Sequence, residues 1–239
     1  MKHGEVRFLS CMYVLSLTLL ALFAIHSLTE SVIVSGNSES DSLIILDAGH
    51  GGTDGGSSAA DGTLESDINL EVTLKTDAIL GLMGEQTLLV RDKDTDLSSD
   101  DAKTIAQKKI SDIRNRVDLV NSYPNAILIS IHQNTFPEEK YHGAQVFYSK
   151  IANSKSLAEL LQNNLRSYVD PSNQRNAKEI SADVYLMNHI QVPGVLVECG
   201  FLTNPEEAAK LKTAEYQKQL AVTIATTVSN YLSEENSGV

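Results

Sequence analysis

The sequence feature that most constrains the fold is the stretch LIILDAGHGGTDGG at residues 43–56. Four apolar residues followed by a glycine-rich segment are typical of a buried strand that ends in a tight loop. Glycine allows the backbone to turn sharply and to approach a bound group closely. His50 lies inside this loop, and open α/β sheets bind their ligands at the carboxyl ends of their strands. The stretch therefore predicts an α/β fold with a candidate reactive imidazole.

The net charge of the chain disfavours some classes of binding partner. With 31 Asp and Glu against 19 Lys and Arg, the 239-residue chain has a net charge of −12. Residues 1–30 contain two basic and two acidic side chains, so the rest of the chain carries all of this charge. An acidic body disfavours nucleic-acid binding and docking on anionic lipid through a basic patch. We therefore expect no nucleic-acid partner.

Residues 1–30 predict an N-terminal membrane anchor or signal segment. Residues 8–28 carry no formal charge, and about 20 apolar residues span a bilayer. Lys2 and Arg7 precede this run, which favours a cytoplasmic N-terminus and an exported body. No clear A-x-A site follows, so an uncleaved anchor is favoured over a cleaved signal. The polar residues 31–42 predict a linker, residues 43–233 one folded domain, and residues 234–239 a C-terminal tail.

Beyond the linker, apolar runs alternate with amphipathic segments. Strands are predicted at residues 43–46, at TLLV within residues 85–91, and at residues 126–131, 144–148, 184–187 and 194–197. Helices are predicted from residue 65 to the glycines at 81 and 84, and at residues 102–122, 154–169, 204–211 and 216–232. Ile105 and Ile110 are expected to face the core. This alternation predicts a single three-layer α/β/α domain with a central, mixed, twisted sheet of about six strands.

Titratable side chains occur near the ends of three predicted strands. His50, His132 and Glu198 follow one strand each, and Glu65 begins the helix after the glycine-rich loop. Two histidines and a carboxylate are a known set of catalytic zinc ligands that leaves a position open for water. Zinc lowers the pKa of that water from about 15.7 to about 7, and a second carboxylate can transfer its proton. Imidazoles more than about 10 Å apart would exclude a shared ion.

Each of these residues also has a structural interpretation. Glu65 could complement the helix dipole, His132 could be a hydrogen-bonded residue at a strand end, and Glu198 could bind backbone amides. His50 could be a bystander in a strand-to-helix turn. A phosphate-binding loop is disfavoured, because neither Gly-Lys-Ser/Thr nor GxGxxG occurs there. The joint occurrence favours a functional site, because polar groups beside buried strands are costly without a partner.

The sequence around these residues resembles the zinc-dependent N-acetylmuramoyl-L-alanine amidases of bacterial cell-wall metabolism. LDAGHGGTDGG is similar to the family pattern D-P-G-H-G-G-x-D-x-G, and LESDINLE resembles E-K-D-x-N-L. ISIHQN is similar to S-I-H-x-N, and VPGVLVECGFLTNPEE to V-P-x-x-L-V-E-x-G-F-L-S-N-x-x-E. Ala48 stands where the family usually has Pro, and Ser66 where it has Lys. Neither departure removes an expected ligand.

The resemblance implies Zn²⁺ bound by His50, Glu65 and His132, with Glu198 as the catalytic acid/base. It also implies that Asn134 hydrogen-bonds the substrate and that the domain at residues 43–233 is catalytic. The expected reaction is hydrolysis of the amide between the lactyl group of N-acetylmuramic acid and L-alanine in peptidoglycan.

Three further stretches resemble the germination-specific amidases of spore-forming bacteria, which act in muramic-δ-lactam formation in the spore cortex. They are DTDL at 94–97, GAQVFY at 143–148 and VYLM at 184–187. This implies cortex glycan strands with stem peptides as substrate, and an exported, membrane-anchored enzyme on the cell-wall side. About ten polar residues follow the helix at 154–169, too few for the inhibitory helix of some division amidases. We therefore expect control by an accessory or activating protein, or by access to substrate.

Three alternative functions are a general vegetative cell-wall amidase, a zinc peptidase of carboxypeptidase type, and an anchored binding module without activity. The order His, Glu, His with gaps of 15 and 67 residues fits the amidase pattern better than a carboxypeptidase. The presence of all four titratable residues disfavours a binding module.

Overall fold

The structure is a computed structural model that describes residues 42–237. Six strands form one sheet in the order β2-β1-β3-β6-β4-β5. Their bounds are β1 (Leu43–Ala48), β2 (Thr87–Leu89), β3 (Ala126–Asn134), β4 (Gln145–Tyr148), β5 (Lys178–Glu179) and β6 (Gly194–Phe201). Strands β2, β1, β3 and β6 are parallel, whereas β4 is antiparallel to β6. The carboxyl ends of the four parallel strands therefore lie at one edge of a mixed sheet.

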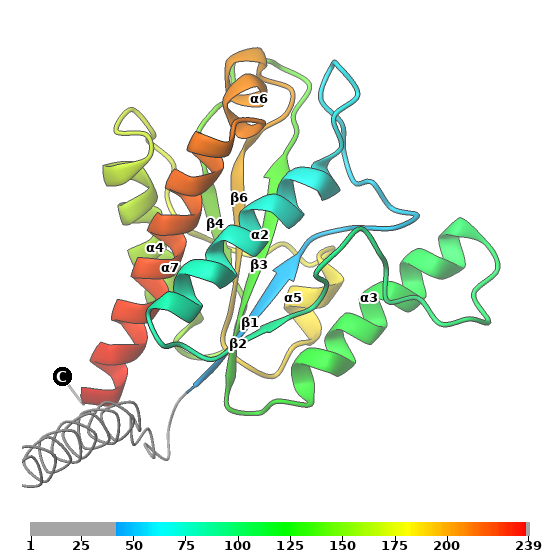
Figure 1. The fold of residues 1–239 in the computed structure, drawn as a ribbon, viewed down its shortest axis with the longest axis horizontal. Helices are drawn as coiled ribbons and strands as arrows, with labels where there is room; N and C mark the ends of the chain where they lie inside the picture. The colour runs from blue at the N-terminus through cyan, green and yellow to red at the C-terminus, as the bar shows by residue number, and fades with distance from the viewer. Residues whose placement is uncertain (1–41, 238–239) are drawn as a thin grey trace, which may run out of the picture. The chain divides into compact units, whose positions relative to one another are not determined.

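Helices cover both faces of this sheet (Figure 1). One face carries α2 (Glu65–Leu82), α4 (Ser154–Tyr168) and α7 (Ala214–Ser237), and the other carries α3 (Ile105–Asn121) and α5 (Tyr185–His189). The short helix α6 (Pro205–Leu211) follows β6. The predicted three-layer α/β/α domain with a mixed sheet of six strands is confirmed.

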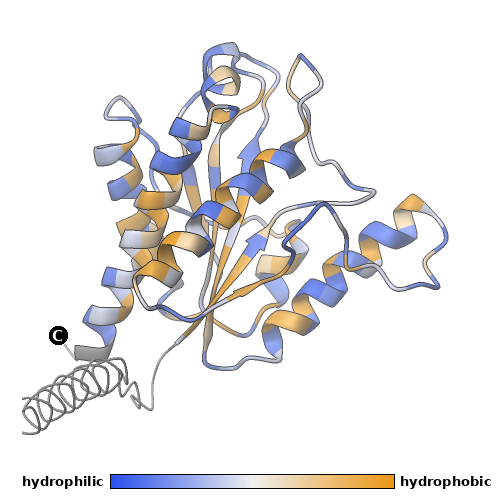
Figure 2. Ribbon diagram, in the orientation of Figure 1, coloured by the Kyte–Doolittle hydropathy of each residue, from blue (hydrophilic) through white to orange (hydrophobic). Residues whose placement is uncertain are grey.

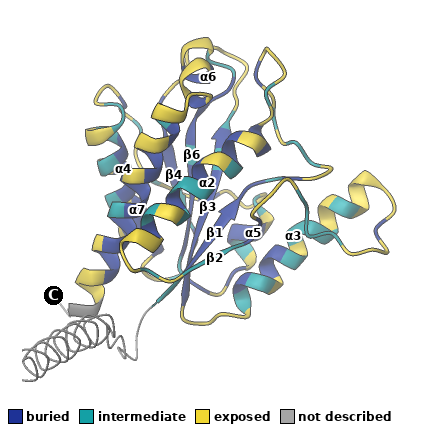
Figure 3. Cartoon of the chain, viewed as in Figure 1, coloured by how far each residue is buried: buried dark blue, intermediate teal, exposed yellow. Residues whose placement is uncertain are grey.

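Alternate residues of β1 point into two separate cores. Ile44 and Leu46 pack in the core under α2, α4 and α7, whereas Ile45 packs in the core under α3 and α5. All three side chains are fully buried. Because both faces are covered, the central strands are continuous apolar runs. Figures 2 and 3 show these strands as hydrophobic and buried, with hydrophilic and exposed residues on the outer helical surfaces.

One predicted strand is wrong. Residues 184–187 were expected to form a strand, but Tyr185–His189 is the helix α5, and the sixth strand is β5. A short apolar run does not distinguish a strand from a buried helical turn. Leu186 and Met187 are nevertheless buried in the core under α3 and α5.

Helix α3 differs from its prediction at its start and in its buried face. Thr104 and Gln107 form a capping box, which starts the helix at Ile105 rather than at residue 102. The side chains of Ile105 and Ile110, expected to face the core, are 64% and 52% exposed. Arg116, in contrast, is buried. The last helix, α7, is longer than predicted. It continues to Ser237, whereas the predicted helix ended at residue 232 and the predicted tail began at residue 234.

No helix within residues 42–237 combines the length and apolarity needed to cross a membrane. The predicted anchor at residues 1–30, and nearly all of the predicted linker, lie outside the described residues.

Candidate metal centre

The loop after β1 places His50 at the carboxyl edge of the sheet. His50 has a left-handed backbone conformation with a φ of 60°, which is uncommon for residues other than glycine. A Cβ atom at Gly49 would lie 2.2 Å from the His132 ring, and one at Gly56 would lie 2.6 Å from Oε2 of Glu65. Glycine at these two positions therefore lets the loop approach the other site residues closely.

Glu65 lies between the two imidazoles. Its Oε1 atom is 3.3 Å from Nε2 of His50 and 3.0 Å from Nδ1 of His132, and the two ring centroids are 5.1 Å apart. One ligand atom from each of the three residues lies within 4.8 Å of the others. Bonds of about 2.0–2.1 Å at tetrahedral angles separate two zinc ligands by about 3.3 Å. The donor set and its spacing therefore fit one divalent ion.

The Glu65 carboxylate is also fixed by backbone amides. Ser57 N–H donates to Oε2 at 2.9 Å, and Gln133 N–H donates to Oε1 at 3.2 Å. Burial alone would raise the pKa of Glu65, but His132 and His50 lower it below its usual range. Burial would likewise lower the pKa of His50, but hydrogen bonds and charges of Glu65 and Asp54 raise it to about 9. Without a metal, Glu65 is therefore ionised and His50 protonated at pH 7.

Glu198 lies beside this group, on the neighbouring strand. His132 of β3 and Glu198 of β6 are register partners in the parallel pair. The Oε2 atom of Glu198 is buried and has no hydrogen-bond partner among residues 42–237. Burial raises the pKa of Glu198 to about 7. A buried, unpaired carboxylate oxygen is costly, so this position is better suited to a reacting group than to a structural one.

Arg116 of α3 fixes the backbone of the His50 loop through hydrogen bonds. Its guanidinium donates to Asp47 Oδ1 at 2.5 Å, to the Ala48 carbonyl at 3.0 Å and to the His50 carbonyl at 2.7 Å. Arg116 and Asp47 are 2% and 1% exposed. Burial raises the pKa of Asp47, but the charge of Arg116 and a hydrogen bond from Ser130 outweigh it and lower that pKa. This buried pair therefore stays charged and fixes the backbone on both sides of Gly49.

A second buried arginine contacts the same segment. Arg91, which follows β2, donates from Nε to the Ala48 carbonyl at 2.8 Å and from Nη2 to the Gly49 carbonyl at 3.1 Å. The same Nη2 also donates to the Ser66 carbonyl at 2.8 Å. Arg91 thereby ties the His50 loop to the first turn of α2, where Glu65 lies.

Asp54 orients the His50 ring. Its Oδ2 atom is 2.9 Å from Nδ1 of His50, and its Oδ1 atom accepts from Lys109 Nζ at 2.7 Å. A carboxylate on the far nitrogen of a metal-binding histidine fixes the ring and makes it more basic. The Nε2 atom of His50 is thereby directed at Glu65.

These side chains open into a cleft of about 360 Å³. Its lining comprises His50, His132, Glu198 and residues of the β1 loop, α3 and the segment that contains α5; they include Asp54, Lys109, Ile113, Asp183, Val184, Tyr185 and Leu186. Of the four titratable residues predicted for the site, only Glu65 does not line it, because Glu65 is buried. The cleft therefore gives a substrate access to both imidazoles and to Glu198.

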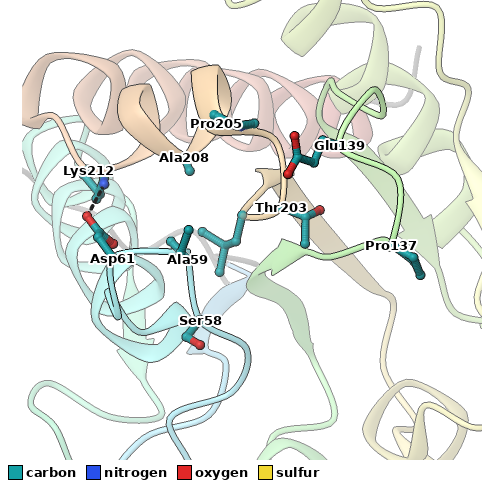
Figure 4. A pocket seen from close by; sticks show the side chains of 11 residues that line it. Ser58, Ala59, Asp61, Pro137, Glu139, Thr203, Pro205, Ala208 and Lys212 are labelled. Carbon is teal, nitrogen blue, oxygen red and sulfur yellow. Dashed lines mark hydrogen bonds and ion pairs between the residues drawn. The ribbon is translucent and has the colours of Figure 1, made fainter.

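A second hollow of about 450 Å³ lies between three loops and α6 (Figure 4). The ion pair between Lys212 and Asp61, at 2.5 Å, crosses one side of it, and Ser58, Thr203 and Glu139 contribute polar atoms. It shares no lining residue with the cleft at His50. The two imidazoles and Glu198 therefore line the first cleft and not this hollow.

Asn134, the predicted substrate-binding residue, is the last residue of β3. Its carbonyl accepts from Leu202 N–H at 2.9 Å, and it does not line the cleft at His50. Its role with substrate stays a prediction. Sequence reasoning missed Asp54, Arg91, Lys109 and Arg116. Asp54 could have been found from the Asp of the G-x-D pattern. Arg116 could have been found as an arginine among the apolar positions of the predicted helix at 102–122.

Comparison with known proteins identifies relatives over the whole domain. The family profile described as N-acetylmuramoyl-L-alanine amidase matches residues 44–230. The germination-specific N-acetylmuramoyl-L-alanine amidase of Bacillus subtilis (strain 168) is 38% identical over 197 residues, 82% of each chain. The N-acetylmuramoyl-L-alanine amidase LytC of the same strain is 32% identical over 192 residues, 79% of this chain and 35% of LytC.

Solved structures agree with this assignment. The CwlD amidase from Clostridioides difficile, in complex with the GerS lipoprotein, has a TM-score of 0.77 and 39% identity, covering 80% of this chain and 98% of that one. An N-acetylmuramoyl-L-alanine amidase from Clostridium difficile 630 has a TM-score of 0.70 and 29% identity, covering 82% and 98%. The chain therefore belongs to the N-acetylmuramoyl-L-alanine amidase family and is an enzyme of that activity.

Proposed function

We propose that this amidase holds a zinc ion with His50, Glu65 and His132. The observation that carries this proposal is the group of two imidazoles and one carboxylate, whose ligand atoms lie within 4.8 Å of one another beside Glu198. Two His and one carboxylate are a common ligand set of hydrolytic zinc sites. When bound, zinc supplies Lewis acidity, which polarises a carbonyl and makes water acidic enough to attack it.

Glu198 is the acid/base of the proposed reaction. It accepts the proton of the attacking water and then donates it to the nitrogen of L-alanine, which leaves as an amine. Burial favours the protonated form that the second step requires, and the nearby His132 and His50 favour the carboxylate that the first step requires. A carboxylate with both forms accessible can carry out both transfers.

The biological setting that we propose is the spore cortex. Two relatives support this: the Bacillus subtilis germination-specific amidase at 38% identity, and the Clostridioides difficile CwlD amidase at 39%. The latter was solved in complex with the GerS lipoprotein, which supports an accessory protein for this chain as well. The predicted membrane anchor would hold the enzyme on the cell-wall side.

The mechanism is tested with Glu198→Gln, which removes the titratable group at nearly constant volume. We expect turnover of glycan strands to fall by about 10²–10⁴-fold, while zinc stays bound. Mass spectrometry of the digest should show free stem peptides that begin at L-alanine for the wild type only. The zinc content of both proteins, from atomic absorption, is the control.

Two outcomes would contradict the mechanism. One is unchanged turnover in Glu198→Gln. The other is full activity of the wild type after complete removal of metal by a chelator. The spore role is tested separately, by expressing the chain in a Bacillus subtilis strain that lacks its germination-specific amidase. Spores without muramic-δ-lactam, despite active enzyme, would indicate a general cell-wall amidase.

A further inference from the structure

The cleft at His50 is lined by one exposed side chain that is permanently basic, Lys109. Of its lining residues, only Lys109 and Arg116 are permanently basic, and Arg116 is buried against Asp47. The Lys109 side chain is 50% exposed, and its ammonium contacts Asp54 Oδ1 at 2.7 Å. An ammonium has three donors, and Asp54 is its single carboxylate partner among residues 42–237. Lys109 therefore has donors available to a ligand in the cleft.

We propose that Lys109 binds a carboxylate of the stem peptide and so directs the peptide, rather than the glycan, along the α3 side of the cleft. This inference rests on the proposed function. The lactyl carboxyl group of N-acetylmuramic acid is consumed in the scissile amide, so the sugar side of that bond is uncharged. The free carboxylates near this bond belong to the peptide. An exposed cation in the cleft therefore attracts the peptide side of the substrate and not the sugar side.

The position of Lys109 suits a group close to the scissile bond. Its ammonium is linked to the His50 ring through the single carboxylate of Asp54, by contacts of 2.7 and 2.9 Å. An extended peptide covers about 3.3–3.6 Å per residue. A carboxylate one or two residues beyond the reacting carbonyl can therefore reach Lys109 while that carbonyl lies at the His50 and His132 end of the cleft.

The negative charge of the chain favours a cation where the peptide binds, beyond the proposed metal position. The chain has a net charge of −12, and Asp54 and Asp183 also line the cleft. An acidic peptide is repelled by this field unless a positive group lies at its binding position. Lys109 can supply that group while it keeps its contact with Asp54, because an ammonium has three donors.

A purely structural role for Lys109, in which it only orients Asp54, predicts a different result. It would affect all substrates equally, because the His50 ring acts on every scissile bond. The experiment therefore compares two sets of glycan strands. In both sets the stem peptide is L-alanyl-D-glutamate with its γ-carboxyl group blocked as an amide, and the α-carboxylate is free in one set and also an amide in the other. The kcat/KM ratio of acid to amide is measured for the wild type, Lys109→Met and Lys108→Met.

Lys108→Met is the matched control, because Lys108 is on the same helix, carries the same charge and does not line the cleft. We expect the wild type and Lys108→Met to prefer the acid, and the acid-to-amide ratio to fall about tenfold in Lys109→Met. Thermal unfolding and zinc content of all three proteins show whether the fold and the metal site are intact.

Each remaining outcome contradicts the proposal. Equal losses on both substrates in Lys109→Met would assign Lys109 a structural role. Equal cleavage of both substrates by the wild type would remove the carboxylate contact but leave the amidase intact. Cleavage of neither substrate by the zinc-loaded wild type would overturn the proposed function, and this inference with it.

Discussion

The site residues are held in two different ways. His132 and Glu198 lie on β3 and β6, the pair at the centre of the sheet, where they are register partners. His50 lies on a loop, has a φ of 60°, and depends on side chains from elsewhere in the chain. The strand residues are positioned by the backbone hydrogen bonds of the sheet. The loop residue is positioned by Arg91, Arg116 and Asp54.

This difference shows where the site is vulnerable. The position of a residue on a central strand is fixed by many backbone hydrogen bonds. It does not depend on any single side chain outside the strand. The loop has fewer such contacts. Two buried guanidinium groups donate to the carbonyls of Ala48, at the end of β1, and of Gly49 and His50 in the loop. Substitutions of the supporting side chains should therefore affect the His50 side of the centre more than the His132 side.

The largest effect is expected for Arg116→Met. This change leaves the Asp47 carboxylate, 1% exposed, without its cation, and removes the donor to the His50 carbonyl. Breaking a buried ion pair on one side typically costs about 3–5 kcal/mol of unfolding free energy. Urea denaturation followed by circular dichroism measures it, and zinc titration measures the accompanying loss of affinity.

The exposed Arg114 of the same helix is the control for Arg116. Arg114→Met should change the unfolding free energy by less than about 0.5 kcal/mol. If Arg116→Met changed the unfolding free energy as little as Arg114→Met, the His50 loop would be fixed by its own backbone. The contrast between His50 on the loop and His132 and Glu198 on the strands would then be wrong.

A smaller effect is expected for Asp54→Asn. This change weakens the carboxylate contact to Nδ1 of His50, at 2.9 Å, and leaves the three proposed ligands in place. Loss of such an outer partner typically lowers metal affinity about 10–100-fold. Competition with a fluorescent zinc chelator measures it. Asp67→Asn, at an exposed position of α2, removes the same charge and should bind zinc like the wild type.

The smallest effect is a pH dependence that arises on the His50 side. Burial lowers the pKa of His50, but Glu65 and Asp54 raise it to about 9 in the metal-free protein. A metal must displace this proton, so apparent zinc affinity should rise with pH, at most about tenfold per unit, until pH 9. Calorimetry at pH 7 in two buffers of different ionisation enthalpy should show about one proton released. No release would mean that His50 is already neutral.

Much of the fold followed from local pattern. Continuous apolar runs marked the central strands, because both faces of a covered parallel sheet are buried. The helix at Tyr185–His189 was missed, because a run of four apolar residues fits either state and only burial under α3 decides between them. Ile105 and Ile110 were expected to be buried but are exposed, whereas Arg116 on the same helix is buried.

The sequence by itself indicated the family, the layers of the fold and the four titratable residues of the candidate site. It could do so because parallel strands share one carboxyl edge, which brings His50, His132 and Glu198 together from positions far apart in the chain. Only the tertiary structure showed which side chains fix the His50 loop. Arg116 contacts Asp47 and His50 across 69 and 66 residues. Periodicity in a sequence does not predict hydrogen bonds between side chains and backbone carbonyls so far apart in the chain.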